Sequence, residues 1–140
     1  MRHHLAQARG KYRIMNIQQL DHLVLTVNDL QASINFYCHV LGMQLVEFAG
    51  NRKALKFGTQ KINLHQSGEE FKPHANKPLS GSADLCFIVE TPIDAIEQEL
   101  NKNSIKIEEG PVIRSGSCGP INSLYIRDPD KNLIELSVRV

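Results

Sequence analysis

The sequence has few cysteines, and their arrangement is not that of a cross-linked or zinc-binding chain. Only three of the 140 residues are cysteines, and no two of them form a Cys-x-x-Cys pair. An odd number without that spacing argues against a disulfide framework and against a structural zinc site. We therefore expect a reducing, cytoplasmic setting, with Cys38 and Cys86 as small buried side chains in their apolar stretches.

Long apolar runs and an excess of one charge are also missing. Runs such as Leu23-Val24-Leu25 are far shorter than the roughly 20 residues of a membrane-spanning helix. The formal net charge is +1, so we expect neither a nucleic-acid groove nor a patch of clustered Lys and Arg for a membrane surface. The basic residues 1–15 lack the apolar segment of a secretory signal, and we interpret them as a flexible N-terminal arm.

What is present suits one folded domain, which we place at residues 16–140. Hydrophobic residues make up 41% of the chain and charged residues 22%, enough of each for a buried core and a polar surface. The order of apolar patterns is strand, helix and three strands in residues 17–66, and the same order returns in residues 83–138. The sequence therefore predicts two tandem β-α-β-β-β units.

Turn and cap residues set the expected bounds. The predicted helices lie near residues 30–41 and 92–102, and the predicted strands at 20–27, 43–48, 53–57, 61–65, 83–90, 105–109, 121–127 and 132–138. Asn28-Asp29 opens the first helix and Gly42 ends it, while Thr91-Pro92 opens the second. The Gly-rich stretch Arg114–Pro120 is predicted to be a loop, either a lid over a pocket or an ordinary surface connection.

Three stretches resemble motifs of the vicinal oxygen chelate superfamily, which includes glyoxalase I, extradiol dioxygenases and bleomycin-resistance proteins. They are Leu20–Leu30 (LDHLVLTVNDL), Phe36-Tyr37 followed by Leu41-Gly42-Met43, and Arg127–Leu136 (RDPDKNLIEL). Lys131 stands where the family often has Gly. The three motifs occur in the family's order, and the resemblance extends from residue 17 to residue 138.

The resemblance implies an α+β fold of two tandem βαβββ units that form an eight-stranded, incompletely closed barrel around a metal ion. The first and last strands of each unit supply the ligands, because side chains on one face of neighbouring strands can converge on one ion. The resemblance also implies a homodimer and a small-molecule substrate.

Carried onto this sequence, the family's ligand positions predict a divalent metal bound by His22, Asp84 and Glu135. A carboxylate between apolar residues, as in Leu133-Ile134-Glu135-Leu136, is costly to bury without a cation. Many metal-dependent members have a His where this chain has Asp84. An aspartate favours harder ions such as Mn, Mg and Fe over Zn, and the sequence does not decide among Mn, Fe, Mg, Ni and Zn.

The fourth ligand position falls on Asn63, where glyoxalases have Glu. His65 lies two residues further on, on the same strand face but displaced by roughly 6.6 Å. It either completes a set of two His and one carboxylate, acts as a proton-transfer group, or faces solvent at a strand end. We favour proton transfer, with Glu135 as the second catalytic residue and Asn63 contacting the substrate.

Further residues are candidates for substrate binding. Arg52 and Lys53, at the head of the third strand, are placed to meet an anionic substrate, although solvated charge beside a turn is the more common explanation of such residues. Tyr125 alternates with apolar strand positions and is predicted to line the cavity.

These residues leave three functions open. The first is a metal-dependent enzyme whose ion binds two oxygens of the substrate, in isomerase, lyase or dioxygenase chemistry. The second is a metal-free protein that sequesters a small compound, and the third is a regulatory domain with a vestigial site. His22 and Glu135 favour the enzyme, whereas Asn63 and Asp84 are atypical ligands.

Overall fold

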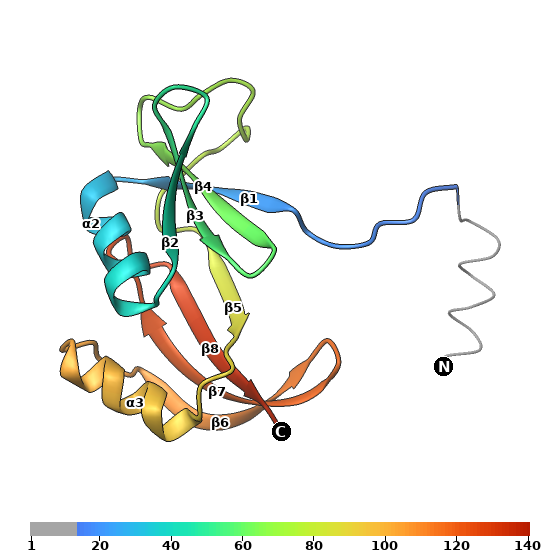
Figure 1. Cartoon of the computed structure of the whole chain (residues 1–140), viewed down its shortest axis with the longest axis vertical. Coiled ribbons are helices and arrows are strands. Elements are labelled where there is room, and N and C mark those ends of the chain that lie inside the picture. Colours follow the sequence, from blue (N-terminus) through green and yellow to red (C-terminus); the bar gives the residue numbers. More distant parts are fainter. Residues whose placement is uncertain (1–13) are drawn as a thin grey trace.

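The computed structural model describes residues 14–140, which form two units joined by a long loop at residues 67–83 (Figure 1). Most of the arm predicted for residues 1–15 lies outside the described residues. The first unit contains β1 (His22–Val27), α2 (Leu30–Asn35), the π-helix η1 (Phe36–Val40), β2 (Gln44–Phe48), β3 (Arg52–Phe57) and β4 (Gln60–Gln66). The second contains β5 (Asp84–Ile88), α3 (Ile93–Lys102), β6 (Glu109–Gly116), β7 (Gly119–Arg127) and β8 (Leu133–Arg139).

Each unit forms its own four-stranded sheet, and the predicted fold class is confirmed. The strand order is β1-β4-β3-β2 in the first sheet and β5-β8-β7-β6 in the second. The pairs β1–β4 and β5–β8 are parallel, and the other pairs are antiparallel. Within the described residues the two sheets do not join, so β1 and β5 are free edges and one chain alone makes no closed barrel.

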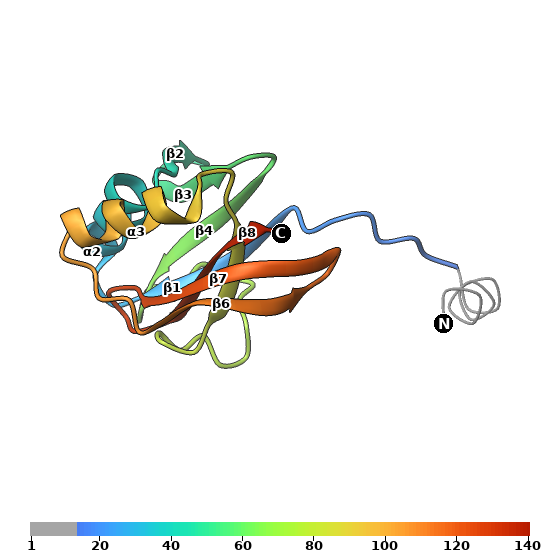
Figure 2. The same cartoon turned by 90° about the horizontal axis from the view of Figure 1, so that it is seen from below.

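The two units share one hydrophobic core. Its buried members come from both sheets and from the helices, which lie on the same side of the molecule in both views (Figures 1 and 2). On β5, Leu85 and Phe87 pack against this core, whereas Asp84, Cys86 and Ile88 are exposed. Each sheet therefore turns one face to the core, and we call the opposite face its open face.

The first helix begins and ends where its cap residues predict. The Asp29 carboxylate accepts a hydrogen bond from the backbone N–H of Ala32 at 3.0 Å, as an N-cap does. After η1 the chain reaches Gly42, whose φ of 75° lies in the left-handed region that glycine adopts without strain. The π-helical last turns were not predicted.

The family's F-Y and D-P-D motifs are joined through one buried carboxylate. The Tyr37 hydroxyl donates to Asp128 at 2.6 Å, and the side chain of Asn132 donates to the same carboxylate oxygen at 2.8 Å. The Asn132 amide oxygen then accepts from the backbone N–H of Ala83 at the entrance to β5. These residues tie the first helix to the second sheet, which is a structural role.

Four predictions about the second unit were wrong. β6 spans Glu109–Gly116, not 105–109, and Arg114–Pro120 belongs to the β6–β7 hairpin, not to a loop. The glycines allow the tight turn of this hairpin, because a Cβ on Gly116 would lie only 2.8 Å from the Gly119 carbonyl oxygen. Pro92, not Thr91, is the N-cap of α3 and forms no side-chain cap bond. Cys86 is exposed on the open face, not buried.

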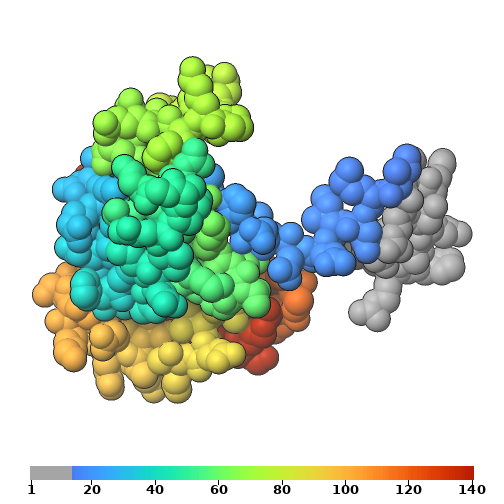
Figure 3. Space-filling view, turned by 45° about the horizontal axis from the view of Figure 1, so that its top comes forward, coloured from blue at the N-terminus to red at the C-terminus, as the bar shows by residue number. Residues whose placement is uncertain are grey.

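Two segments project from the body. Residues 14–21 extend away from it without regular secondary structure, and residues 67–82 form a lobe beside the β2–β3 hairpin (Figure 3). No helix among residues 14–140 is long and apolar enough to cross a membrane.

Candidate functional site

The open face of the first sheet carries the first pair of predicted ligands. His22 opens β1 opposite Lys61, and Asn63 lies opposite Val24, so His22 and Asn63 are diagonal neighbours on adjacent strands. The Nδ1 atom of His22 lies 2.8 Å from the Asp21 carboxylate, which orients the ring and leaves Nε2 for a ligand bond. The Oδ1 atom of Asn63 is buried and has no hydrogen-bond partner within residues 14–140.

His65 belongs to the same face but is separated from His22 along the strand. It pairs with Thr26, four residues further along than the His22–Lys61 pair, which corresponds to roughly 13 Å. The side chain is only 6% exposed, and the Phe71 ring packs edge-on against it at 5.4 Å between centroids. Burial, followed by the positive charge of Arg52, holds the pKa of His65 below its usual value. His65 is therefore a neutral imidazole at physiological pH.

The open face of the second sheet carries the other pair. Glu135 on β8 lies opposite Cys86 on β5 and opposite Tyr125 on β7. Asp84, at the start of β5, is the diagonal neighbour of Glu135 and is exposed to solvent. The arrangement repeats that of His22 and Asn63 in the first sheet.

A chain of hydrogen bonds fixes Glu135. The hydroxyl of Ser123 donates to Oε2 of Glu135 at 2.6 Å and lies 2.7 Å from the hydroxyl of Ser137. The Ser137 hydroxyl also lies 3.4 Å from the same carboxylate oxygen and can donate either to it or to Ser123, and the Cys86 thiol lies 3.3 Å from the Ser137 hydroxyl. The residue as a whole is exposed, but partial burial of its thiol beside Ser137 raises the pKa of Cys86, so the thiol stays protonated at neutral pH.

Sequence reasoning missed both serines, although each sits two residues from a site residue on its own strand. Ser123 and Ser137 are fully buried, so their hydroxyls have no solvent to compete for these bonds. Strand alternation puts each serine on the face of its site residue, and the β7–β8 register, in which Ser123 lies opposite Ser137, brings Ser123 beside Glu135.

Tyr125 lies opposite Glu135 on the open face of the second sheet, and its orientation is fixed. Its hydroxyl accepts a hydrogen bond from Nε of Arg114 at 3.0 Å, and Arg114 also forms an ion pair with Glu109 at 2.6 Å. Because the Tyr125 oxygen is used as an acceptor, its own proton is free for a bound molecule. Arg114, which we had assigned to a loop, is therefore a strand residue of the site.

One chain does not bring the predicted metal ligands together. Among residues 14–140, no three His, Cys, Asp or Glu side chains are grouped closely enough to hold a metal ion. The structure instead contains two half-sites, His22 with Asn63 and Asp84 with Glu135, on the open faces of different sheets. The convergence of His22, Asp84 and Glu135 remains a prediction.

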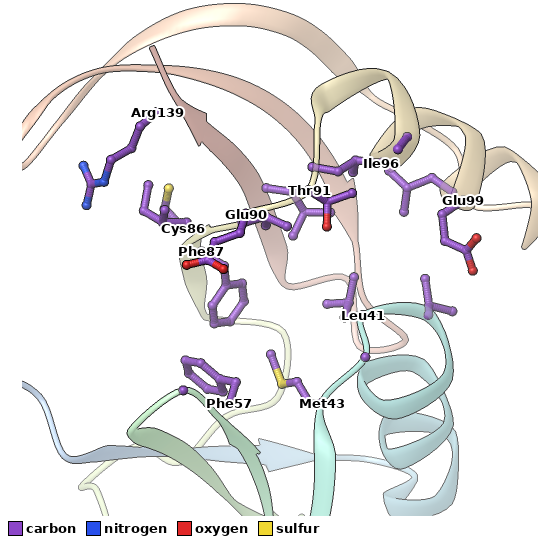
Figure 4. A pocket seen from close by; sticks show the side chains of 18 of the residues that line it. Leu41, Met43, Phe57, Cys86, Phe87, Glu90, Thr91, Ile96, Glu99 and Arg139 are labelled. Atoms are coloured by element: carbon purple, nitrogen blue, oxygen red, sulfur yellow. The ribbon is translucent and has the colours of Figure 1, made fainter.

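A separate cavity of about 980 Å³ opens between the two units (Figure 4). The rings of Phe57 and Phe87 meet edge to face within it, with 5.3 Å between centroids. Leu41 and Met43 line it from the first unit, and Ile96 on α3 from the second. The sequence did not predict this cavity, because its walls come from elements far apart in the chain.

Comparison with known proteins gives one consistent family. The family described as Glyoxalase/Bleomycin resistance protein/Dioxygenase superfamily matches residues 19–136. "Virulence protein STM3117" of Salmonella typhimurium is 58% identical over 123 residues, which cover 88% of this chain and 85% of that protein. "Glyoxalase domain-containing protein RDO1" of Mycosarcoma maydis is 52% identical over 125 residues, which cover 89% of this chain and 70% of that protein.

The fold has the same relative among solved structures. The crystal structure of STM3117 superposes with a TM-score of 0.89 at 57% identity, covering 90% of this chain and all of that one. Neither relative's name states a reaction.

Proposed function

Since the chain belongs to the Glyoxalase/Bleomycin resistance protein/Dioxygenase superfamily, we propose that it is a divalent-metal-dependent enzyme acting on a small molecule. The proposed ligands are His22, Asp84 and Glu135, with Asn63 facing the substrate beside them. Their nitrogen and carboxylate donors suit Mn²⁺, Fe²⁺ or Mg²⁺ better than Ni²⁺ or Zn²⁺.

The observation that carries this proposal is the environment of Glu135. Its carboxylate is half-buried and is hydrogen-bonded to Ser123, yet no Lys, Arg or His of residues 14–140 forms an ion pair with it. A carboxylate in such a place calls for a cation. The buried, unpartnered Oδ1 of Asn63 is a second acceptor that fits a bound ion or a ligand N–H or O–H group.

A second copy of the chain would complete the site. The open faces expose apolar side chains next to the half-sites: Val24 is 46% exposed beside His22, and Ile88 is 45% exposed beyond Asp84. The free edges of β1 and β5 adjoin these residues. We propose a homodimer in which His22 and Asn63 of one protomer face Asp84 and Glu135 of the partner subunit, which covers the apolar residues and brings the ligands together.

Bound there, a divalent ion would supply Lewis-acid stabilisation to two neighbouring oxygens of the substrate. The chain's own groups suit the accompanying proton movements. Neutral His65 has an unpartnered Nδ1 and can accept a proton, and Tyr125 has a hydroxyl proton free to donate. We assign His65 to proton transfer, because its displacement along β4 does not favour ligation beside His22.

The test is metal content and Mn²⁺ titration of protein purified without chelator. We expect the wild type to bind one ion per chain, and His22→Ala and Glu135→Gln to weaken binding at least roughly tenfold. His39→Ala removes an exposed imidazole from η1 and Glu97→Gln an acid from α3, so both should bind like wild type. His65→Ala should keep its metal and lose roughly 10²–10⁴-fold in turnover.

Equal loss of metal in His65→Ala and His22→Ala would refute the proton-transfer assignment. If the wild type binds no divalent ion, or if the His39 and Glu97 controls lose as much as the ligand variants, the metal proposal fails.

A metal-free binding protein is the second candidate, and the large cavity is the observation that favours it. Its volume of about 980 Å³ and its lining by Phe57, Phe87 and Met43 suit an apolar ligand. Under this alternative, Phe87→Ala would abolish ligand binding, whereas Glu135→Gln would leave it unchanged.

A further inference from the structure

The open face of the first sheet holds three cations with no carboxylate partner. Arg52 and Lys56 on β3 and Lys61 on β4 are on this face, because the residues that alternate with them, such as Leu55 and Ile62, are buried in the core. The ion pairs within residues 14–140 that involve Lys or Arg use Lys53, Arg114 and Arg127 instead.

Two of these cations, Lys56 and Lys61, repel each other, and Lys61 has an aromatic partner in Phe48, whose ring centroid lies 3.8 Å from the Lys61 ammonium. Lys56 lies directly opposite Lys61 in the β3–β4 ladder, and like charges at such positions destabilise a sheet. The nearby Asp21 is exposed and already hydrogen-bonded to His22, so it offsets this repulsion only weakly. The face therefore attracts anions.

At one end of the face, Arg52 is held in a specific geometry. Its guanidinium lies 4.2 Å from the centroid of the Phe71 ring, and the same ring packs edge-on against His65. A guanidinium stacked on a ring keeps its N–H groups available at its edges, in the planar fork that matches a carboxylate or phosphate group.

His65 adds a hydrogen-bonding group beside this fork. Its side chain is 94% buried (6% exposed), and its Nδ1 has no partner within the described residues. Lys53 on β3 pairs with Leu64 on β4. Because the two strands are antiparallel, the next residues in the ladder, Arg52 and His65, lie opposite each other, and both are on the open face. A buried ring nitrogen without a partner is uncommon and marks a position for a ligand atom.

We propose that Arg52 binds an oxyanion, a carboxylate or phosphate group, at one end of the substrate, with the His65 imidazole beside it and available for the proton transfer assigned above. The proposal rests on the proposed function, because the other end of that substrate would lie near Asn63 and His22. Along β4, His65 lies two residues, or roughly 7 Å, beyond Asn63. It lies four residues, or roughly 13 Å, beyond Lys61, which pairs with His22. The substrate is thus an elongated anionic metabolite, with the anion remote from the oxygens that face the metal.

The experiment uses the metal-free full chain with inorganic phosphate and acetate as separate probes, at an ionic strength held constant with NaCl. The readouts are the imidazole NMR signals of His65 and the thermal unfolding midpoint. We expect a saturable response of the wild type to at least one probe and at least tenfold weaker binding by Arg52→Gln. Lys53→Gln is the matched control: it removes the same charge one residue away, on the opposite face, and should bind like wild type.

Arg52→Lys is a second variant, for use if Arg52→Gln disturbs the fold. It keeps the positive charge but replaces the planar guanidinium by an ammonium group, so it should weaken anion binding several-fold. A response to phosphate alone identifies a phosphate-bearing substrate, and a response to acetate alone a carboxylate. No saturable response to either probe, or equal responses of Arg52→Gln and Lys53→Gln, would overturn the proposal. Failure of the wild type to bind Mn²⁺ with phosphate binding intact would instead remove the metal proposal alone.

Discussion

Ser123 shows how much of a site can depend on one buried hydroxyl. Its bond to Glu135 fixes one carboxylate oxygen and leaves the other free. Because groups that orient a metal ligand contribute strongly to affinity, we expect Ser123→Ala to weaken Mn²⁺ binding roughly 10- to 100-fold. The measurement is a Mn²⁺ titration of the wild type and the variant.

The chain offers a close control in Ser33, which is fully buried on α2 and whose hydroxyl has no partner within residues 14–140. Ser33→Ala removes the same atom from an equally buried position and should leave Mn²⁺ affinity unchanged. Matching losses in the two variants would show that Ser123 acts through stability and not through Glu135.

Single residues were predictable where their chemistry is local. The Asp29 carboxylate caps the first helix by accepting a hydrogen bond from a backbone N–H only three residues further along the chain. Gly42 follows the end of that helix with a positive φ. Lys131 replaces the family's glycine yet keeps its left-handed conformation, with a φ of 69°. The roles of Ser123 and Cys86 were not predictable, because they depend on which residues of other strands lie opposite.

At the scale of elements, the bond from Tyr37 to Asp128 links η1 to the β7–β8 turn. Asp128 is 4% exposed, and its carboxylate also accepts from the backbone N–H groups of Asp130 and Asn132. Removing a donor from a buried charged acceptor costs roughly 1.5–3 kcal/mol, so Tyr37→Phe should lower the free energy of unfolding by about that amount. Urea denaturation at neutral pH measures it.

Tyr125→Phe is the comparison for this prediction. The Tyr125 hydroxyl accepts from Arg114 on a partly exposed face, and its loss should cost less than about 1 kcal/mol. If the two variants lose the same stability, the Tyr37–Asp128 bond is not a major link between the units.

Elements with strong periodicity were placed correctly, and those that depend on pairing were not. The helices at Leu30–Val40 and Ile93–Lys102 match their predicted positions within a residue or two. β6 was misplaced because Gly110-Pro111 and Gly116 look like loop residues in sequence. In the structure they lie in a strand with a register shift between Glu109 and Val112, where Gly110 has a φ of 105° and no room for a Cβ.

For the whole molecule, His65 should make stability depend on pH. Its pKa is lowered in the folded protein by burial and by Arg52, so the unfolded chain binds a proton more readily. The stabilisation from neutral His65 is therefore present above the unfolded value of about 6.5 and is lost as the pH falls toward the folded value. We expect the loss of unfolding free energy between pH 7.5 and 5.5 to be smaller in His65→Gln than in the wild type.

Asp21, Glu70 and Glu108, whose pKa values are lowered, titrate below this window, and Asp130, whose pKa is raised by burial, is present in both proteins, so the difference between wild type and His65→Gln isolates His65. His39→Gln, at an exposed position on η1, should keep the wild-type pH dependence. A pH dependence in His65→Gln that equals the wild type would show that Arg52 and burial do not hold this ring neutral.

The proposed division of each metal site between two protomers can be tested with dimers that contain two different variants. If each metal site joins His22 of one protomer to Glu135 of the partner subunit, then His22→Ala and Glu135→Gln damage different halves of it. A mixed dimer of the two variants has one site with both defects and one site with none. Neither variant alone has an intact site.

We therefore expect that unfolding and refolding an equal mixture of the two variants together restores Mn²⁺ binding to about a quarter of the wild-type capacity. Half of the dimers that form at random are mixed, and each of these has one intact site of two. Each variant refolded alone should show none of this recovery. If all three ligands instead came from one chain, mixing would restore nothing, and the exposed Val24 and Ile88 would need another explanation.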